Sequence, residues 1–80
     1  MTEPTTEQKI EQITAQWIID MMNDFKIKNP RQLSILANIR YESLNLALNE
    51  KRPISSEIKN TLYWYFLFLD AERQIQEFNR

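Results

Sequence analysis

Few side chains in this sequence could do covalent or acid–base chemistry, because the chain contains no histidine and no cysteine. Their absence removes thiol and imidazole groups, the ordinary zinc ligands and the side chain that titrates near neutral pH. The remaining candidates are two acidic groups, Asp20 with Asp24 and Asp70 with Glu72 and Glu77. Neither group comes with a further ligand type, so we interpret both as solvated helix faces. We expect no enzyme activity, no metal and no cofactor.

The chain also lacks glycine. Phosphate-binding loops, dinucleotide-binding turns and most tight hairpins need backbone conformations that glycine adopts at little cost. Eighty residues, of which 42% are hydrophobic, have room for one domain. We therefore expect a single all-α domain, stabilised by helix packing or by self-association instead of disulfides.

Charge is distributed unevenly along the chain, although the net charge is only -1. Residues 1–25 carry a net charge of -4, and residues 60–80 carry -1. Residues 26–59 hold seven Lys or Arg against three Glu, a net charge of +4. A polyanion would meet a basic centre between acidic ends. The same pattern also fits solvated faces with no ligand.

A long amphipathic helix is predicted from Thr6 onward, over roughly 18 residues. Its apolar side chains recur at intervals of three and four residues: Ile10, Ile13, Trp17, Met21 and Phe25. Residues 1–5 hold little to bury, so we expect them to form a mobile tail and residues 6–80 to form the folded domain.

A second helix is predicted from Pro30 to about Ala37. Asn29 is a favourable N-cap, Pro30 suits the first helical position, and Gln32 can return a capping-box bond. Asn38 follows, and asparagine enters the left-handed region without a large penalty, so we expect a tight turn there.

A third short helix is predicted over residues 41–49. Leu44, Ala47 and Leu48 form a one-sided apolar face, and Pro53 ends the pattern. Leu44 and Leu48 are expected to point inward.

A final helix of roughly 23 residues begins after Ser55, which is a good N-cap. Its first apolar stripe is expected to close the core: Ile58, Leu62, Tyr65 and Leu69. A second apolar stripe has the spacing of a coiled-coil seam and is our candidate dimer interface. The interface residues are Trp64, Leu67, Phe68, Ala71, Ile75 and Phe78.

Two partners are open for this second stripe. One is a second copy of the chain, which would make a homodimer through the final helices, alone or together with the first helix. The other is the first helix of the same chain, through Trp17, Ile18 and Met22.

Two short helices joined by a three- or four-residue turn, with a basic loop directly after the second, are typical of a helix-turn-helix. Residues 30–56 resemble the DNA-binding domains of the Cro and phage-repressor family, most of all in the stretch from Asn49 to Ser55. Asn38 and Glu50 stand where that family usually has glycine, and Arg40 where it usually has Ser or Thr. The expected fold class is all-α, a compact five-helix bundle with the helix-turn-helix in helices two and three and with long first and last helices; the apolar spacing itself places four helices.

The resemblance implies a sequence-specific regulator, a repressor of phage or mobile-element type, that acts as a homodimer on a palindromic site in double-stranded DNA. It implies that the outward face and N-terminus of the third helix contact bases. These residues are Arg40, Tyr41, Glu42, Asn45, Leu46 and Asn49. Asn45 or Asn49 would bond an adenine bidentately, and Leu46 would meet a thymine methyl. Phosphates would be held by Arg31, Lys51 and Arg52.

A second hypothesis treats the same scaffold as a protein-binding module or inhibitor, such as an antirepressor, an antitoxin-like protein or an anti-defence protein. Overall acidity, Glu42 on the outward face and the aromatic final helix favour it. Since no apolar h-region precedes Ile10 and the longest apolar run covers only residues 62–69, we expect a cytoplasmic protein without a membrane partner.

Overall fold

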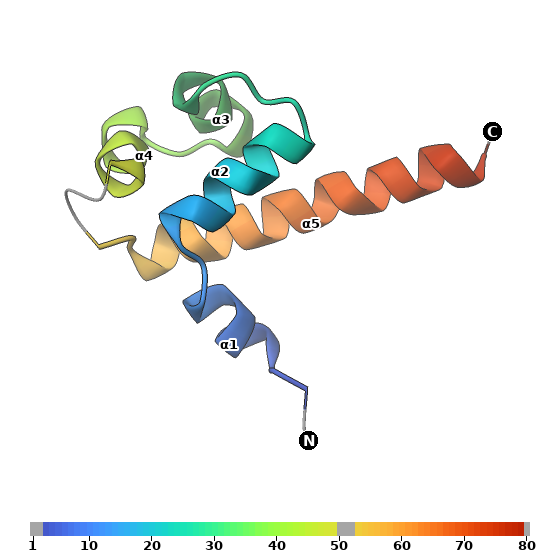
Figure 1. Cartoon of the computed structure of the whole chain (residues 1–80), viewed down its shortest axis with the longest axis horizontal. Coiled ribbons are helices and arrows are strands. Elements are labelled where there is room, and N and C mark those ends of the chain that lie inside the picture. The colour runs from blue at the N-terminus through green and yellow to red at the C-terminus, as the bar shows by residue number, and fades with distance from the viewer. Residues whose placement is uncertain (1–2, 50–52, 80) are drawn as a thin grey trace.

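α-Helices are the regular elements of residues 3–49 and 53–79, the part of the chain that the computed structural model describes. In chain order they are α1 (Thr6–Glu11), α2 (Ala15–Asp24), α3 (Pro30–Ala37), α4 (Tyr41–Leu48) and α5 (Ser56–Phe78) (Figure 1). The all-α prediction is confirmed. No helix in these residues has the length and apolar character needed to cross a membrane.

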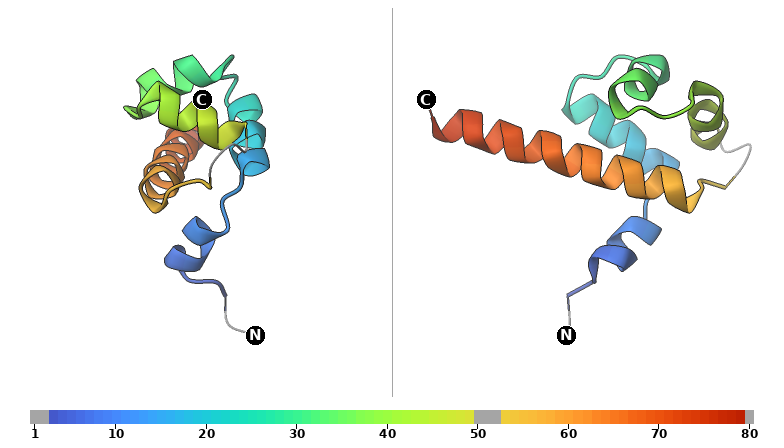
Figure 2. Two further views of the ribbon diagram at one scale, coloured as in Figure 1. Left: turned by 90° about the vertical axis from the view of Figure 1, so that its left-hand side faces the viewer. Right: turned by 180° about the vertical axis from the view of Figure 1, so that it is seen from behind.

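The other four helices are arranged around the long helix α5. α2 runs beside the first part of α5, α3 and α4 lie together over one side of this pair, and α1 lies on the other side (Figures 1 and 2). α4 is at the end of the molecule where α5 begins. The last turns of α5 project beyond the other helices, so they have no neighbouring helix in the described chain.

Phe66 is the centre of the core. It is 1% exposed, and its ring meets Trp17 edge to face, with centroids 5.7 Å apart, while it stacks on Phe25 at 5.9 Å. Aromatic pairs of this kind add about 0.5–1.5 kcal/mol each beyond the burial of their surface. Because Trp17 lies in the first turn of α2 and Phe25 is its C-cap, one side chain of α5 packs against both ends of α2.

The core face of α5 differs in part from the prediction. Leu62 is fully buried as expected, but Ile58, Tyr65 and Leu69 are only half-buried and pack at the margin of the core. Phe66, four residues after Leu62, is buried in their place. Burial of Tyr65 and the nearby charge of Glu72 raise the pKa of the Tyr65 phenol above its ordinary value.

The prediction of one long helix from Thr6 onward is wrong, because the chain forms two helices in this segment. α1 ends at Glu11 and α2 begins at Ala15. Thr14 is the N-cap of α2, and its Oγ1 accepts a hydrogen bond from the backbone N–H of Trp17 at 3.1 Å. Ile13 is buried in the break, so the apolar spacing continues across it and does not reveal it.

α1 has its own start and its own attachment. Thr5, which we assigned to the tail, caps α1 through a reciprocal pair of bonds with Gln8. At the other end of α1, the Lys59 ammonium of α5 donates to the carbonyl oxygen of Glu11 at 2.9 Å. This bond places the positive charge of Lys59 at the C-terminus of α1, where the helix dipole favours a cation.

Arg73 joins α5 to the end of α2. Its guanidinium donates to Asp70 at 2.8 Å and to Asp24 at 3.1 Å, and it lies 4.6 Å from the ring centroid of Phe25. The hydrogen bonds to Asp70 and Asp24 raise the pKa of Arg73 above its ordinary value. Two of the carboxylates that the sequence offered as ligands are therefore held by an arginine.

The turns after α2 and α3 use left-handed residues other than glycine. Lys26 has φ 59° and Asn38 has φ 56°. After each of them, the next residue donates its backbone N–H five residues back, from Ile27 to Met22 at 2.8 Å and from Ile39 to Ser34 at 2.9 Å. This pattern is the Schellman motif, whose left-handed position is usually glycine.

We predict that Lys26→Gly stabilises the fold by about 1 kcal/mol. In the left-handed region the Cβ of lysine crowds the neighbouring carbonyl oxygen, and glycine has no Cβ. Urea unfolding followed by circular dichroism, at one fixed protein concentration, measures the change. Lys26→Ala is the matched control: it removes the charge but keeps the Cβ, so no comparable gain is expected. Equal gains in both variants would show that charge, and not backbone strain, is responsible.

Candidate nucleic-acid interface

α3 begins almost as predicted. Asn29 Oδ1 accepts from the backbone N–H of Gln32 at 2.8 Å, and Pro30 occupies the first turn. Gln32 Oε1 accepts from the backbone N–H of Lys28 at 2.9 Å, one residue before the expected capping-box partner. The predicted return bond is therefore shifted, and it orders the residue that leads into the helix.

The connection between α3 and α4 is short. α3 ends at Ala37 as predicted, and only residues 38–40 separate it from α4. The predicted left-handed turn at Asn38 is confirmed. Because Leu33 on α3 and Leu44 on α4 are both fully buried in the same core cluster, the two helices are held as one unit.

One face of α4 is buried and the opposite face is exposed. Leu44 and Ala47 are buried, and Leu48 is half-buried at the edge of the core. Glu42 and Asn49 are exposed on the other side. The expected inward face therefore corresponds to the observed burial, and of the expected outward residues Glu42 and Asn49 are exposed, while Asn45 and Leu46 are half-buried.

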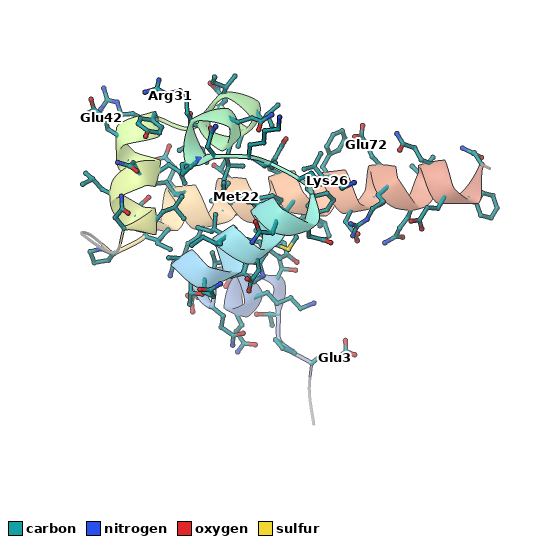
Figure 3. The ribbon with its side chains drawn as sticks, turned by 45° about the horizontal axis from the view of Figure 1, so that its top comes forward. Glu3, Met22, Lys26, Arg31, Glu42 and Glu72 are labelled. Carbon is teal, nitrogen blue, oxygen red and sulfur yellow. The ribbon has the colours of Figure 1, made fainter. Side chains whose placement is uncertain are left out.

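The first turns of α3 and α4 are linked by a cation–π contact. The Arg31 guanidinium lies 4.4 Å from the ring centroid of Tyr41. Arg31 is exposed, and Figure 3 shows that its side chain and that of Glu42 project on the same side of the molecule. The contact places a cation beside the exposed face of α4.

Asn45 and Asn49 lie one helical turn apart, and their side chains are hydrogen-bonded. Asn49 Nδ2 donates to the backbone oxygen of Asn45 at 2.9 Å and to Asn45 Oδ1 at 3.1 Å. Two of the predicted base-contacting residues are thus brought together. The sequence predicted the two side chains on one face but not the bonds between them.

The remaining predicted site residues lie at the edges of α4 or beyond the described chain. Leu46 is half-buried and, with Arg40, lines a hollow of about 460 Å³ between α4 and the start of α5. Arg40 is the N-cap of α4, and its side chain makes no capping hydrogen bond. Lys51 and Arg52, the other predicted phosphate ligands, lie outside the described residues.

The second stripe of α5 is exposed over its whole length. Trp64 is 50% exposed, Phe68 59%, Ile75 59% and Phe78 89%, and Leu67 and Ala71 are exposed beside them. The alternative in which this stripe packs against the first helix is wrong, because Phe66 takes that position. The interpretation as a dimer interface stays a prediction.

Sequence reasoning missed two exposed apolar side chains on α3. Ile35 is 74% exposed and Leu36 is 49% exposed. The signal was available for Ile35, which lies two residues after Leu33 and so faces away from Leu33 and Ala37, but not for Leu36, which lies three residues after Leu33. Within the described ranges, no three acidic residues gather as a metal site would require.

α3 and α4 are thus two short helices packed on one core, and their outer surface carries the polar face of α4 and Arg31 together with the apolar Ile35 and Leu36. No known family model, curated protein or solved structure matches the chain.

We predict that Arg40→Ser stabilises the fold by about 1 kcal/mol, because serine can accept from a backbone N–H in the first turn of α4 and Arg40 does not. Thermal or urea unfolding measures the change. Arg40→Ala removes the same side chain without adding an acceptor, so it is the control. If Ser and Ala variants are equally stable, the uncapped start of α4 costs the protein nothing.

Proposed function

We propose that the protein is a sequence-specific, double-stranded DNA-binding transcriptional regulator, a repressor of phage or mobile-element type that acts as a homodimer on a palindromic operator. In this proposal α3 and α4 are a helix-turn-helix, and α4 enters the major groove. The observation that carries it is the pair itself: two eight-residue helices joined by three residues on a common core, with a polar face of the second exposed.

Electrostatics supports DNA as the ligand. Residues 26–59, the segment that contains α3 and α4, have a net charge of +4, and within the two helices and their connection Arg31 and Arg40 stand against Glu42. Arg31 lies in the first turn of α3 and Arg40 directly before α4, where helix N-termini favour anions. Such contacts to phosphates fix position, and base specificity then depends on Glu42, Asn45, Leu46 and Asn49 on α4. We also assign Lys51 and Arg52 to the phosphate contacts, from the sequence alone.

The direct test is selection from a randomised duplex pool at about 100 mM salt, where phosphate contacts alone give weak binding. We expect enrichment of an inverted repeat whose half-sites lie about one helical turn apart. A folded protein that enriches no sequence would contradict the proposal.

Arg31→Ala tests where the DNA lies. We expect it to weaken binding to all duplexes by a similar factor and to reduce the slope of log affinity against log salt by about 1. Fluorescence anisotropy at several salt concentrations measures this slope. Arg73→Ala is the control, because Arg73 is held by Asp24 and Asp70. Equal losses in the two variants would contradict contact at α3.

The exposed stripe of α5 supports the homodimer. Its members are spaced 4, 3, 4 and 3 residues apart, as in a two-helix seam, and carry no charge. The exposed parts of its aromatic and aliphatic side chains amount to on the order of 600 Å² per copy, or roughly 1,200 Å² for a pair, which reaches the range of stable interfaces.

Phe68→Asp is expected to convert the dimer to a monomer without loss of helix, because Phe68 is exposed within one chain and the new carboxylates would repel each other in the seam. Sedimentation equilibrium measures the mass and circular dichroism the helix content. Gln76→Asp is the control and should remain dimeric, because Gln76 is exposed outside the stripe, at a hollow that it lines with Asp24 and Leu69. A Phe68→Asp dimer would place the interface elsewhere.

The second candidate function is a protein-binding module or inhibitor on the same scaffold. Exposure of Ile35 and Leu36 on α3 favours it, because a DNA contact does not require two apolar side chains there. Under this candidate the duplex pool stays unenriched. A protein partner would instead co-purify and be lost in Leu46→Asp or Trp64→Ala.

A further inference from the structure

The hydrogen bonds between Asn45 and Asn49 determine how both amides are oriented. A backbone carbonyl can only accept, so the nitrogen of Asn49 must face the carbonyl oxygen of Asn45, 2.9 Å away. The same nitrogen is 3.1 Å from the Asn45 side chain, which must therefore present its oxygen to this donor. Neither amide can be flipped without placing two donors or two acceptors together.

This arrangement divides the amide groups between the two residues. Both hydrogens of Asn49 Nδ2 are engaged, which leaves Asn49 Oδ1 as an acceptor. Asn45 Oδ1 is engaged, which leaves the two hydrogens of Asn45 Nδ2 as donors. Neither atom has a partner among the described residues. Asn49 alone would have to break a bond of the pair to contact a base edge bidentately, whereas Asn45 alone could do so only through the second lone pair of the oxygen that already accepts from Asn49.

We propose that Asn45 and Asn49 act as one unit that recognises a single adenine, with Asn45 Nδ2 donating to adenine N7 and Asn49 Oδ1 accepting from the N6 amino group. This inference rests on the proposed DNA-binding function. In the major groove, adenine is the base that offers an acceptor beside a donor. Guanine and thymine offer no donor to Asn49, and cytosine offers no acceptor to Asn45.

The bonds also hold the unit in place before it meets DNA. Both residues lie on α4, one turn apart, and Asn49 is tied to the backbone as well as to the neighbouring side chain. A preordered pair loses less side-chain entropy on binding than two independent amides. Removal of either residue is therefore expected to disable the other.

The experiment is a double-mutant cycle of Asn45→Ala and Asn49→Ala on the selected operator and on duplexes with each base changed in turn. We expect each single variant to lose about tenfold preference for adenine at the same base pair. The double variant should lose little more than either single variant, because the residues act together. Ser43→Ala, a half-buried change on the same helix outside the proposed base-contacting residues, is the control and should keep the preference.

Asn45→Asp separates the pair from its contact with DNA. Aspartate keeps an acceptor for Asn49 but lacks the amino group that would reach adenine N7. The side-chain amide signals of Asn49, measured by NMR without DNA, should therefore stay close to those of the native protein in Asn45→Asp and move in Asn45→Ala. The adenine preference should be lost in both.

Three results would overturn the inference. Asn49 amide signals that are unchanged in Asn45→Ala would show that the pair does not form. Losses at two different base pairs that add in the double variant would show two independent contacts, while DNA binding itself would stand. A chain that selects no operator would overturn the inference together with the function on which it rests.

Discussion

The packing of Phe66 between Trp17 and Phe25 is the constraint on which the other elements depend. It holds α2 along α5, and this pair presents the apolar surface on which Leu33 of α3 and Leu44 of α4 are buried. A chain of this size buries a modest fraction of its surface on folding, so each such contact is a large part of the total burial that stabilises the fold. The exposed face of α4 has a defined direction because its opposite face is committed to this core.

Local capping made much of the fold predictable from the sequence. Asn29 and Pro30 start α3, Asn38 ends it in the left-handed region, and Ser55 starts α5 as expected. The break between α1 and α2 was not predictable from apolar spacing, because Ile13 stays in register with the stripe on both sides. Thr14, a capping residue within that stripe, was the available signal.

The two faces of α4 were predictable from the sequence in part, and the interactions of its side chains were not. Helical periodicity placed Glu42 and Asn49 outward, and burial of the opposite face agrees. Periodicity reveals neither side-chain hydrogen bonds nor cation–π contacts, so the bond between Asn45 and Asn49 and the contact of Arg31 with Tyr41 were not predictable from it. The core position of Phe66 was missed for a related reason: it lies between the two stripes of α5, and only the position of α2 decides which face is buried.

The central claim is that the outer surface of α3 and α4 contacts DNA. The most direct measurement follows backbone amide signals of the folded protein by NMR while a short duplex is added at roughly 50 mM salt, where phosphate contacts are strong. If DNA binds at this surface, the largest changes fall on Arg31, Tyr41, Glu42 and Asn49, with little change at the exposed stripe of α5. Changes confined to α5, or none at saturating duplex, would contradict it.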